Sequence, residues 1–167
     1  TADEAARAPE GLHAAPARGR GAEGLLYTLQ ISVPDCTGCG CCAANCPAGG
    51  KALTMIPRAE AEDRRDVWNY ALGLSDKNVF DAFTVRGSQF RQPLLEFSAA
   101  CAGCGETPYA RLLTQLFGTR VYWANATGCS QAWGAAMPGI PYTTNSKGQG
   151  PAWSNSLFEN NAEFSLG

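Results

Sequence analysis

Five of the eight cysteines lie within the eleven residues from Cys36 to Cys46, and this crowding constrains the fold more than any other feature. Disulfide bridges stabilise by closing loops, so thiols this close together do not form several independent bridges. The first residues mix Ala, Gly and Arg without the apolar core of a secretion signal. We therefore expect a cytoplasmic protein whose thiols bind metal.

The spacing of these cysteines predicts iron–sulfur ligation. It follows C-x2-C-x2-C-x3-C-P, the ligand pattern of bacterial ferredoxins, and Pro47 completes it. The four ligands of the pattern are Cys36, Cys39, Cys42 and Cys46. The two-residue gaps let the first three thiolates converge on one 4Fe-4S cluster, whereas the three-residue gap directs Cys46 to a second cluster. Gly38 and Gly40 permit the tight backbone turns that this arrangement requires.

Zinc is the main alternative metal, because paired Cys-x-x-Cys units also form tetrahedral zinc sites. Zinc ribbons, however, need neither the third cysteine of this run nor the proline after the fourth. Cys41 falls outside the iron–sulfur pattern. We expect its side chain to point away from the cluster, as a small packed or partly exposed thiol.

The ligand set is incomplete within these 167 residues. Under the two-cluster rule the first three cysteines need a fourth ligand from elsewhere, and Cys46 needs three partners from a sister motif. No second run with that spacing occurs in the sequence. A stand-alone ferredoxin-type carrier would have to recruit Cys41 or the later cysteines, against the usual geometry.

The remaining three cysteines form a second candidate site. Cys101 and Cys104 make a Cys-x-x-Cys pair followed by Glu106, and Cys129 stands in an Ala-Thr-Gly-Cys-Ser stretch. A redox dithiol, a zinc site and a cluster missing one ligand all fit this arrangement. Glu106 also suits a helix N-terminus, where the macrodipole stabilises a carboxylate.

Two short strands are expected to flank the first cysteine run. Residues 25–33 alternate apolar and polar side chains as a half-buried strand does, and the apolar run 52–56 ends at Pro57. Residues 59–72 then carry apolar residues at helical spacing up to Gly73. A strand, a cysteine loop and a returning strand make half of a small α+β ferredoxin-like unit.

A helix followed by a strand is expected later in the chain. Thr107 suits the N-cap, Pro108 the first helical position and Gly118 the C-terminus. The apolar residues between them recur at i, i+3, i+4, i+7 and i+8, which predicts one apolar face. That face comprises Tyr109, Leu112, Leu113, Leu116 and Phe117. Residues 120–124 follow as a buried strand, the order of an α/β layer, and the tryptophans, Trp133 among them, are expected to pack rather than stack on a ligand.

Charge and hydropathy argue against two classes of partner. The net charge is −2 at pH 7 and no basic run interleaves with aromatic residues, so we expect no nucleic-acid partner. No apolar stretch reaches the roughly 18–20 residues that span a bilayer, so we expect no membrane insertion.

Taken together, four stretches resemble the pyruvate:ferredoxin (flavodoxin) oxidoreductases. They are residues 35–47, 90–109, 124–130 and 141–164. The later three are far more specific than any ferredoxin motif, and the resemblance covers most of the chain from about Pro9 onward. It implies that the chain is an internal piece of a larger enzyme.

The resemblance also implies a domain organisation. Residues 1–58 would be the second half of a 4Fe-4S ferredoxin-like domain and residues 59–93 a connector. Residues 94–167 would open an α/β thiamine-diphosphate-binding domain. The fold class expected is thus an α+β ferredoxin-like half-domain followed by the start of an α/β domain.

Carried onto this sequence, the family's ligands of the cluster nearest the thiamine fall on Cys101, Cys104 and Cys129. Glu106 and Cys129 fall on positions that also touch the thiamine cofactor. The implied reaction is CoA-dependent oxidative decarboxylation of pyruvate, with thiamine diphosphate and magnesium as cofactors. The clusters would pass electrons to ferredoxin or flavodoxin, in a parent enzyme expected to be a homodimer.

The parts of the family that bind pyruvate, CoA and the magnesium diphosphate do not match any residues of this chain. We therefore assign no catalytic residue here and expect the chain alone to be inactive. Two other functions stay open: a stand-alone ferredoxin-type electron carrier, and a zinc-binding interaction module.

Overall fold

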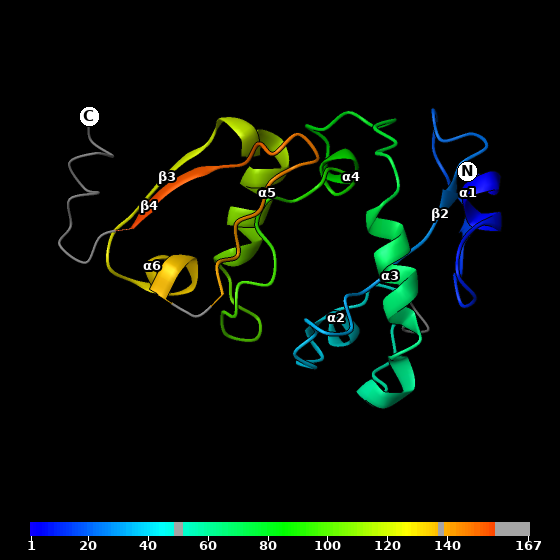
Figure 1. Ribbon diagram of the computed structural model, residues 1–167, viewed down its shortest axis with the longest axis horizontal. Coiled ribbons are helices and arrows are strands. Elements are labelled where there is room, and N and C mark those ends of the chain that lie inside the picture. Colours follow the sequence, from blue (N-terminus) through cyan, green and yellow to red (C-terminus); the bar gives the residue numbers. More distant parts are fainter. Residues whose placement is uncertain (49–51, 137–138, 156–167) are drawn as a thin grey trace. The chain divides into compact units, whose positions relative to one another are not determined.

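The computed structural model describes residues 1–48, 52–136 and 139–155 (Figure 1). The chain divides into two units, Thr1–Val79 and Phe80–Gly167. The division falls inside the stretch 59–93 that the sequence suggests as a connector. Among the helices of the described part of the chain, none has both the length and the apolar composition that a membrane crossing requires.

Helix α1 (Ala2–Ala6) opens the first unit and is capped by its own sequence. Thr1 Oγ1 accepts the backbone N–H of Glu4 at 3.3 Å, and the Glu4 carboxylate accepts from the Thr1 amino group at 2.7 Å. The Tyr70 hydroxyl donates to the Glu4 carbonyl at 2.6 Å, and Lys77 Nζ lies 2.8 Å from the Glu4 carboxylate. Glu4 therefore joins the start of this unit to residues near its end.

Helix α3 (Arg64–Leu72) follows the 3-10 turn η1 (Arg58–Ala61) and gives way to Gly73, as the sequence predicts. Val67, on the inner side of α3, is 1% exposed. The other buried apolar residues of the first unit are Ala22, Val33 and Ala61. The core of this unit is small, so capping and side-chain hydrogen bonds hold much of it together.

The strands expected around the cysteine run are shorter than predicted or missing. β2 covers only Leu26–Tyr27, which pairs antiparallel with β1 (Ala15–Pro16). Beyond this pair, the predicted strand 25–33 is not paired, and Val33 alone of its alternating apolar side chains is buried. The described residues 52–56 form no strand either. The first prediction is thus confirmed only at Leu26–Tyr27 and the second is wrong, because a strand needs a partner for its backbone groups, which alternation does not supply.

The second unit begins with the short helix α4 (Val85–Ser88) and contains the longer helix α5 (Thr107–Phe117). The 3-10 turn η2 (Gly118–Arg120) leads from α5 to β3 (Tyr122–Asn125). This confirms the predicted helix and, with a shift of its bounds, the predicted strand at 120–124.

The second unit also contains a two-stranded parallel sheet, whose second strand is the last described element of the chain. β3 pairs with β4 (Ala152–Asn155), and Figure 1 shows the two strands side by side. Between them in sequence lie α6 (Cys129–Gln131) and the π-helical turn η3 (Ala132–Ala136). The core cluster of this unit consists of Leu95, Ala110 and Trp133, with Ala100, Trp123 and Tyr142 packed against it.

Helix α5 buries a different face from the one predicted. The residues that it buries are Ala110, Thr114 and Gln115. Tyr109, which is 72% exposed, and Leu113 lie at the surface instead. Thr114 and Gln115 turn inward because their side chains bind the backbone of the preceding segment, at Leu94 N–H and at Arg91 O, each at 3.0 Å.

Candidate cluster-binding loops

The first cysteine run forms a loop with one short helix, α2 (Cys41–Ala44), which starts after Gly40. Gly38 and Gly40 adopt φ values of 69° and 75°. Glycine occupies this left-handed region without the steric strain that a Cβ would cause. The two turns that the sequence predicts within the loop are therefore present.

Backbone amides around the loop stabilise thiolates. The Cys41 N–H lowers the pKa of the Cys39 thiol, and the N–H groups of Ala48 and Ala52 lower the pKa of the Cys46 thiol. Metal ligands must be thiolates, so these donors favour the form that binds. Amide donors of this kind also tune iron–sulfur clusters through the cysteine sulfurs. In its donor chemistry the loop fits an iron–sulfur cluster.

Cys41, which falls outside the iron–sulfur pattern, contacts one of the pattern cysteines. Its thiol interacts with the Cys39 thiol, and this contact is the largest cause of the raised pKa of Cys41. Cys41 is half-buried, which agrees with the expected packed or partly exposed thiol. That its side chain points away from a cluster stays a prediction.

The four pattern cysteines differ in their exposure. Cys36, Cys39 and Cys42 are exposed, and Cys46 is half-buried. Over residues 1–48, 52–136 and 139–155, no three Cys, His, Asp or Glu side chains are grouped closely enough to hold a metal ion. The loop offers accessible sulfurs of suitable chemistry. That Cys36, Cys39 and Cys42 converge on one cluster, with Cys46 directed to a second, stays a prediction of the spacing.

The second candidate site draws on two segments of the second unit. Cys104 N–H donates to Cys101 O at 3.0 Å across a tight turn, in which Gly103 has a φ of 72°. The backbone N–H groups of Thr107 and Glu106, at the start of α5, lower the pKa of the Cys104 thiol. Cys129 stands on a separate segment.

Cys129 is the first residue of α6 and is exposed. The residue before it, Gly128, has a φ of 164°, which is ordinary extended backbone. Cys101 is exposed as well, whereas Cys104 is half-buried. Like the first run, these thiols are accessible from solvent, and their joint ligation stays a prediction.

A hydrogen bond links the two cysteine-bearing segments of this site. Trp133 Nε1 donates to Glu106 Oε2 at 3.3 Å. Glu106 follows Cys104 by two residues, and Trp133 follows Cys129 by four. The sequence predicts packing for Trp133, which its burial confirms, but not its second role as a donor. No local sequence signal indicates that role, because the acceptor lies 27 residues away in the chain.

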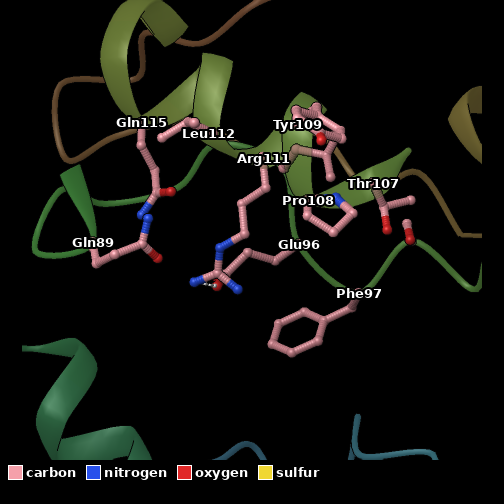
Figure 2. A pocket seen from close by; sticks show the side chains of 11 residues that line it. Gln89, Glu96, Phe97, Thr107, Pro108, Tyr109, Arg111, Leu112 and Gln115 are labelled. Carbon is pink, nitrogen blue, oxygen red and sulfur yellow. Dashed lines mark ion pairs between the residues drawn. The ribbon is translucent and has the colours of Figure 1, made fainter. Parts of the chain in front are cut away.

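An open groove of about 590 Å³ lies beside α5 (Figure 2), and Thr107, which lines it, also hydrogen-bonds to the Cys104 thiol. Arg111 reaches from the helix to Glu96, and the two side chains form an ion pair at 3.3 Å. Phe97 borders the groove with a φ of 57°, which is uncommon for a residue with a Cβ. None of the predicted site residues lines this groove.

Known proteins match the chain closely, although no family model matches it. It is 60% identical over 166 residues to the pyruvate-flavodoxin oxidoreductase of Enterobacter agglomerans. It is 57% identical over 164 residues to the pyruvate:ferredoxin oxidoreductase of Moorella thermoacetica. The chain belongs to the pyruvate:ferredoxin (flavodoxin) oxidoreductase family.

This family membership rests on nearly the whole chain but on a small part of each relative. The two matches cover 99% and 97% of the chain and 14% of each oxidoreductase. The pyruvate dehydrogenase (NADP+) of Cryptosporidium parvum is 55% identical over 163 residues, which make up 8% of its length. The resemblance read from four stretches of sequence is confirmed. Because the match to one relative covers 99% of the chain, both cysteine groups lie within the shared segment.

Proposed function

We propose that this chain is an electron-transfer segment of a pyruvate:ferredoxin (flavodoxin) oxidoreductase and binds 4Fe-4S clusters. Cys36, Cys39 and Cys42 are three ligands of one cluster, and Cys46 is a ligand of a second. The missing ligands come from parts of the parent polypeptide outside these 167 residues. This division follows from the spacing rule for two-cluster ferredoxins.

One observation carries the proposal. In a member of this oxidoreductase family, a run with ferredoxin spacing has backbone N–H groups that stabilise the Cys39 and Cys46 thiolates. Zinc sites also use thiolates, but the three-residue gap before Cys46 and the following Pro47 belong to the iron–sulfur pattern.

Cys101, Cys104 and Cys129 are proposed as three ligands of a further cluster, next to thiamine diphosphate. Glu106 and Cys129 contact the thiamine cofactor in this proposal. The exposed Glu106 carboxylate fits that role, because an ionised carboxylate accepts several hydrogen bonds and Trp133 supplies one. When bound, thiamine diphosphate provides the electron sink for decarboxylation and the clusters provide one-electron transfer.

The parent enzyme is proposed to carry out the CoA-dependent oxidative decarboxylation of pyruvate and to reduce ferredoxin or flavodoxin. It would be a cytoplasmic homodimer with magnesium at the cofactor diphosphate. Within it, residues 1–58 would complete a ferredoxin-like domain, residues 59–93 would connect, and residues 94–167 would begin the thiamine-diphosphate domain.

Adjacent cysteines provide a direct test of this proposal. The full-length parent enzyme would be purified anaerobically as Cys42→Ala and as Cys41→Ala, with iron, acid-labile sulfide and zinc measured beside the EPR spectrum of the dithionite-reduced protein. Cys42→Ala should lose the signal of one cluster and up to about four iron atoms per chain. Cys41→Ala, one residue away and outside the pattern, should keep the cluster signal and the iron.

Each other outcome would contradict a defined part of the proposal. Stoichiometric zinc with no cluster signal in the unmodified enzyme would make the run a zinc site. Equal cluster loss in both cysteine variants would show that the spacing rule does not assign the ligands.

A further inference from the structure

The indole of Trp133 is held firmly by the core of the second unit. Its side chain is 4% exposed and belongs to the same cluster as Leu95 and Ala110. It stands in the π-helical turn η3, which continues directly from α6. Because the ring is enclosed, its N–H points in a fixed direction, and an acceptor there avoids the free-energy cost of a buried donor without a partner.

The acceptor is the Glu106 carboxylate, at 3.3 Å from the indole nitrogen. Glu106 occupies the N-cap position of α5, yet its side chain makes no capping hydrogen bond there. The carboxylate is thus turned to Trp133 instead of to the first turn of its own helix. One oxygen is anchored while Glu106 stays exposed, so the remaining acceptor positions are available to a ligand.

Trp123 shows that packing in this core does not by itself direct an indole to a carboxylate. It packs against the same cluster, with its ring centroid 6.3 Å from that of Tyr142. Its Nε1 is buried and has no hydrogen-bond partner within the part of the chain that the structure describes. The pairing of Trp133 with Glu106 is therefore a specific feature, and Trp123 offers a matched comparison.

We propose that Trp133 is a positioning residue whose buried indole N–H holds the Glu106 carboxylate in the orientation that meets the thiamine cofactor. The inference rests on the proposed function, in which Glu106 contacts that cofactor. Trp133 acts only through Glu106. Since Trp133 follows Cys129 by one helical turn and Glu106 follows Cys104, the same bond also fixes the carboxylate relative to both cysteine segments.

A double-mutant cycle in the full-length parent enzyme tests this role. The variants are Trp133→Phe, Glu106→Ala, the two combined, and Trp123→Phe. The dissociation constant of thiamine diphosphate would be measured on cofactor-free enzyme with magnesium, by calorimetry. Cluster content would be checked by EPR in every variant, so that a damaged fold is recognised.

We expect Trp133→Phe to weaken thiamine diphosphate binding about three- to tenfold, which is the size of one ordinary intramolecular hydrogen bond, because Trp133 acts on the cofactor only through Glu106. Trp123→Phe should change it less than about twofold, because that N–H orients no carboxylate. In the Glu106→Ala background, Trp133→Phe should have no further effect, since the two residues act as one unit.

The possible failures are distinguishable. If Glu106→Ala leaves thiamine diphosphate binding unchanged, the proposed contact of Glu106 with the cofactor is wrong, and the inference fails with it. If Glu106→Ala weakens binding but Trp133→Phe does not, or if the Trp133→Phe effect persists in the Glu106→Ala background, the contact stands and Trp133 is merely structural. Should Trp133→Phe not fold, replacing the indole by benzothiophene removes the N–H at nearly constant volume, and the same readings apply.

Discussion

Leu94 and Thr114 lie twenty residues apart in sequence but share a buried hydrogen bond, in which Leu94 N–H donates to Thr114 Oγ1 at 3.0 Å. Thr114 in turn donates to Arg111 O at 2.7 Å, so its hydroxyl both accepts and donates a hydrogen bond. The bond fixes the segment before the second cysteine pair against α5. It is therefore part of the support for the candidate site.

We predict that Thr114→Val destabilises the chain by about 1–3 kcal/mol, because the buried Leu94 N–H would lose its acceptor while the side-chain volume is kept. The free energy of unfolding in urea, followed by tryptophan fluorescence, measures this. Thr119→Val, at an exposed position of η2, is the control and should change it by less than about 0.5 kcal/mol. Equal stability of both variants would show that the bond is not maintained in solution.

The same bond explains why the face of α5 could not be predicted from the sequence. Periodicity placed Tyr109 and Leu113 inside, since apolar residues at helical spacing normally face a core. In the structure Thr114 and Gln115 face inward, because they satisfy backbone groups of a neighbouring segment. The bounds of the helix, which depend on local capping and glycine signals, were predicted to within a residue.

In the candidate sites, too, some features follow from local sequence signals and others depend on contacts between distant residues. The glycine turns at Gly38 and Gly40 and the family itself follow from local motifs and were predicted. The bond between Trp133 and Glu106 joins residues 27 positions apart and required the fold. The strand predicted at 25–33 is formed only at Leu26–Tyr27 for a related reason, because its partner is not encoded in its own alternation.

Glycine is required at position 118 because the Leu94 side chain lies close to its Cα, and not because of its backbone angle. Its φ is −46°, but a Cβ would lie 2.7 Å from Leu94 Cδ1. We predict that Gly118→Ala costs about 1–3 kcal/mol of unfolding free energy through overpacking. Adding Leu94→Val, which shortens the opposing side chain, should recover part of that loss.

The control for this prediction is Gly139→Ala, since nothing lies within 4 Å of a Cβ added at Gly139. Its unfolding free energy in urea should match that of the unmodified chain or slightly exceed it. A Gly118→Ala chain as stable as Gly139→Ala would mean that Leu94 moves aside freely.

The contact between Lys77 and Glu4 makes the first unit sensitive to acid. Hydrogen bonding to Lys77 is the largest cause that lowers the pKa of Glu4 from its usual 4.5 to about 2. A carboxyl with a depressed pKa stabilises the fold above pH 4.5, and this contribution is lost as the pH falls to about 2. Lys77→Met should therefore reduce stability above pH 4.5 and have progressively less effect toward pH 2.

Unfolding free energies measured between pH 2 and pH 7 test this, with the Glu4 carboxyl titrated by NMR. Lys147→Met, which removes the same charge from an exposed position of the second unit, should leave the Glu4 titration unchanged. An unaltered Glu4 pKa in Lys77→Met would rule out the ion pair as its cause.

Gly40 separates Cys39 from Cys41 and has a φ of 75° at the start of α2. Nothing lies within 4 Å of a Cβ added there, so a substitution is opposed only by the backbone angle. Alanine in this left-handed region costs about 1–2 kcal/mol, whereas asparagine visits it more readily.

Relaxation of that backbone strain would move the Cys41 N–H away from the Cys39 thiol. We therefore predict that Gly40→Ala lowers the iron content of the full-length enzyme and that Gly40→Asn lowers it less. Iron and sulfide per chain, with the EPR signal, measure this order. Full and equal cluster loading in both variants would show that the loop conformation does not depend on glycine at this position.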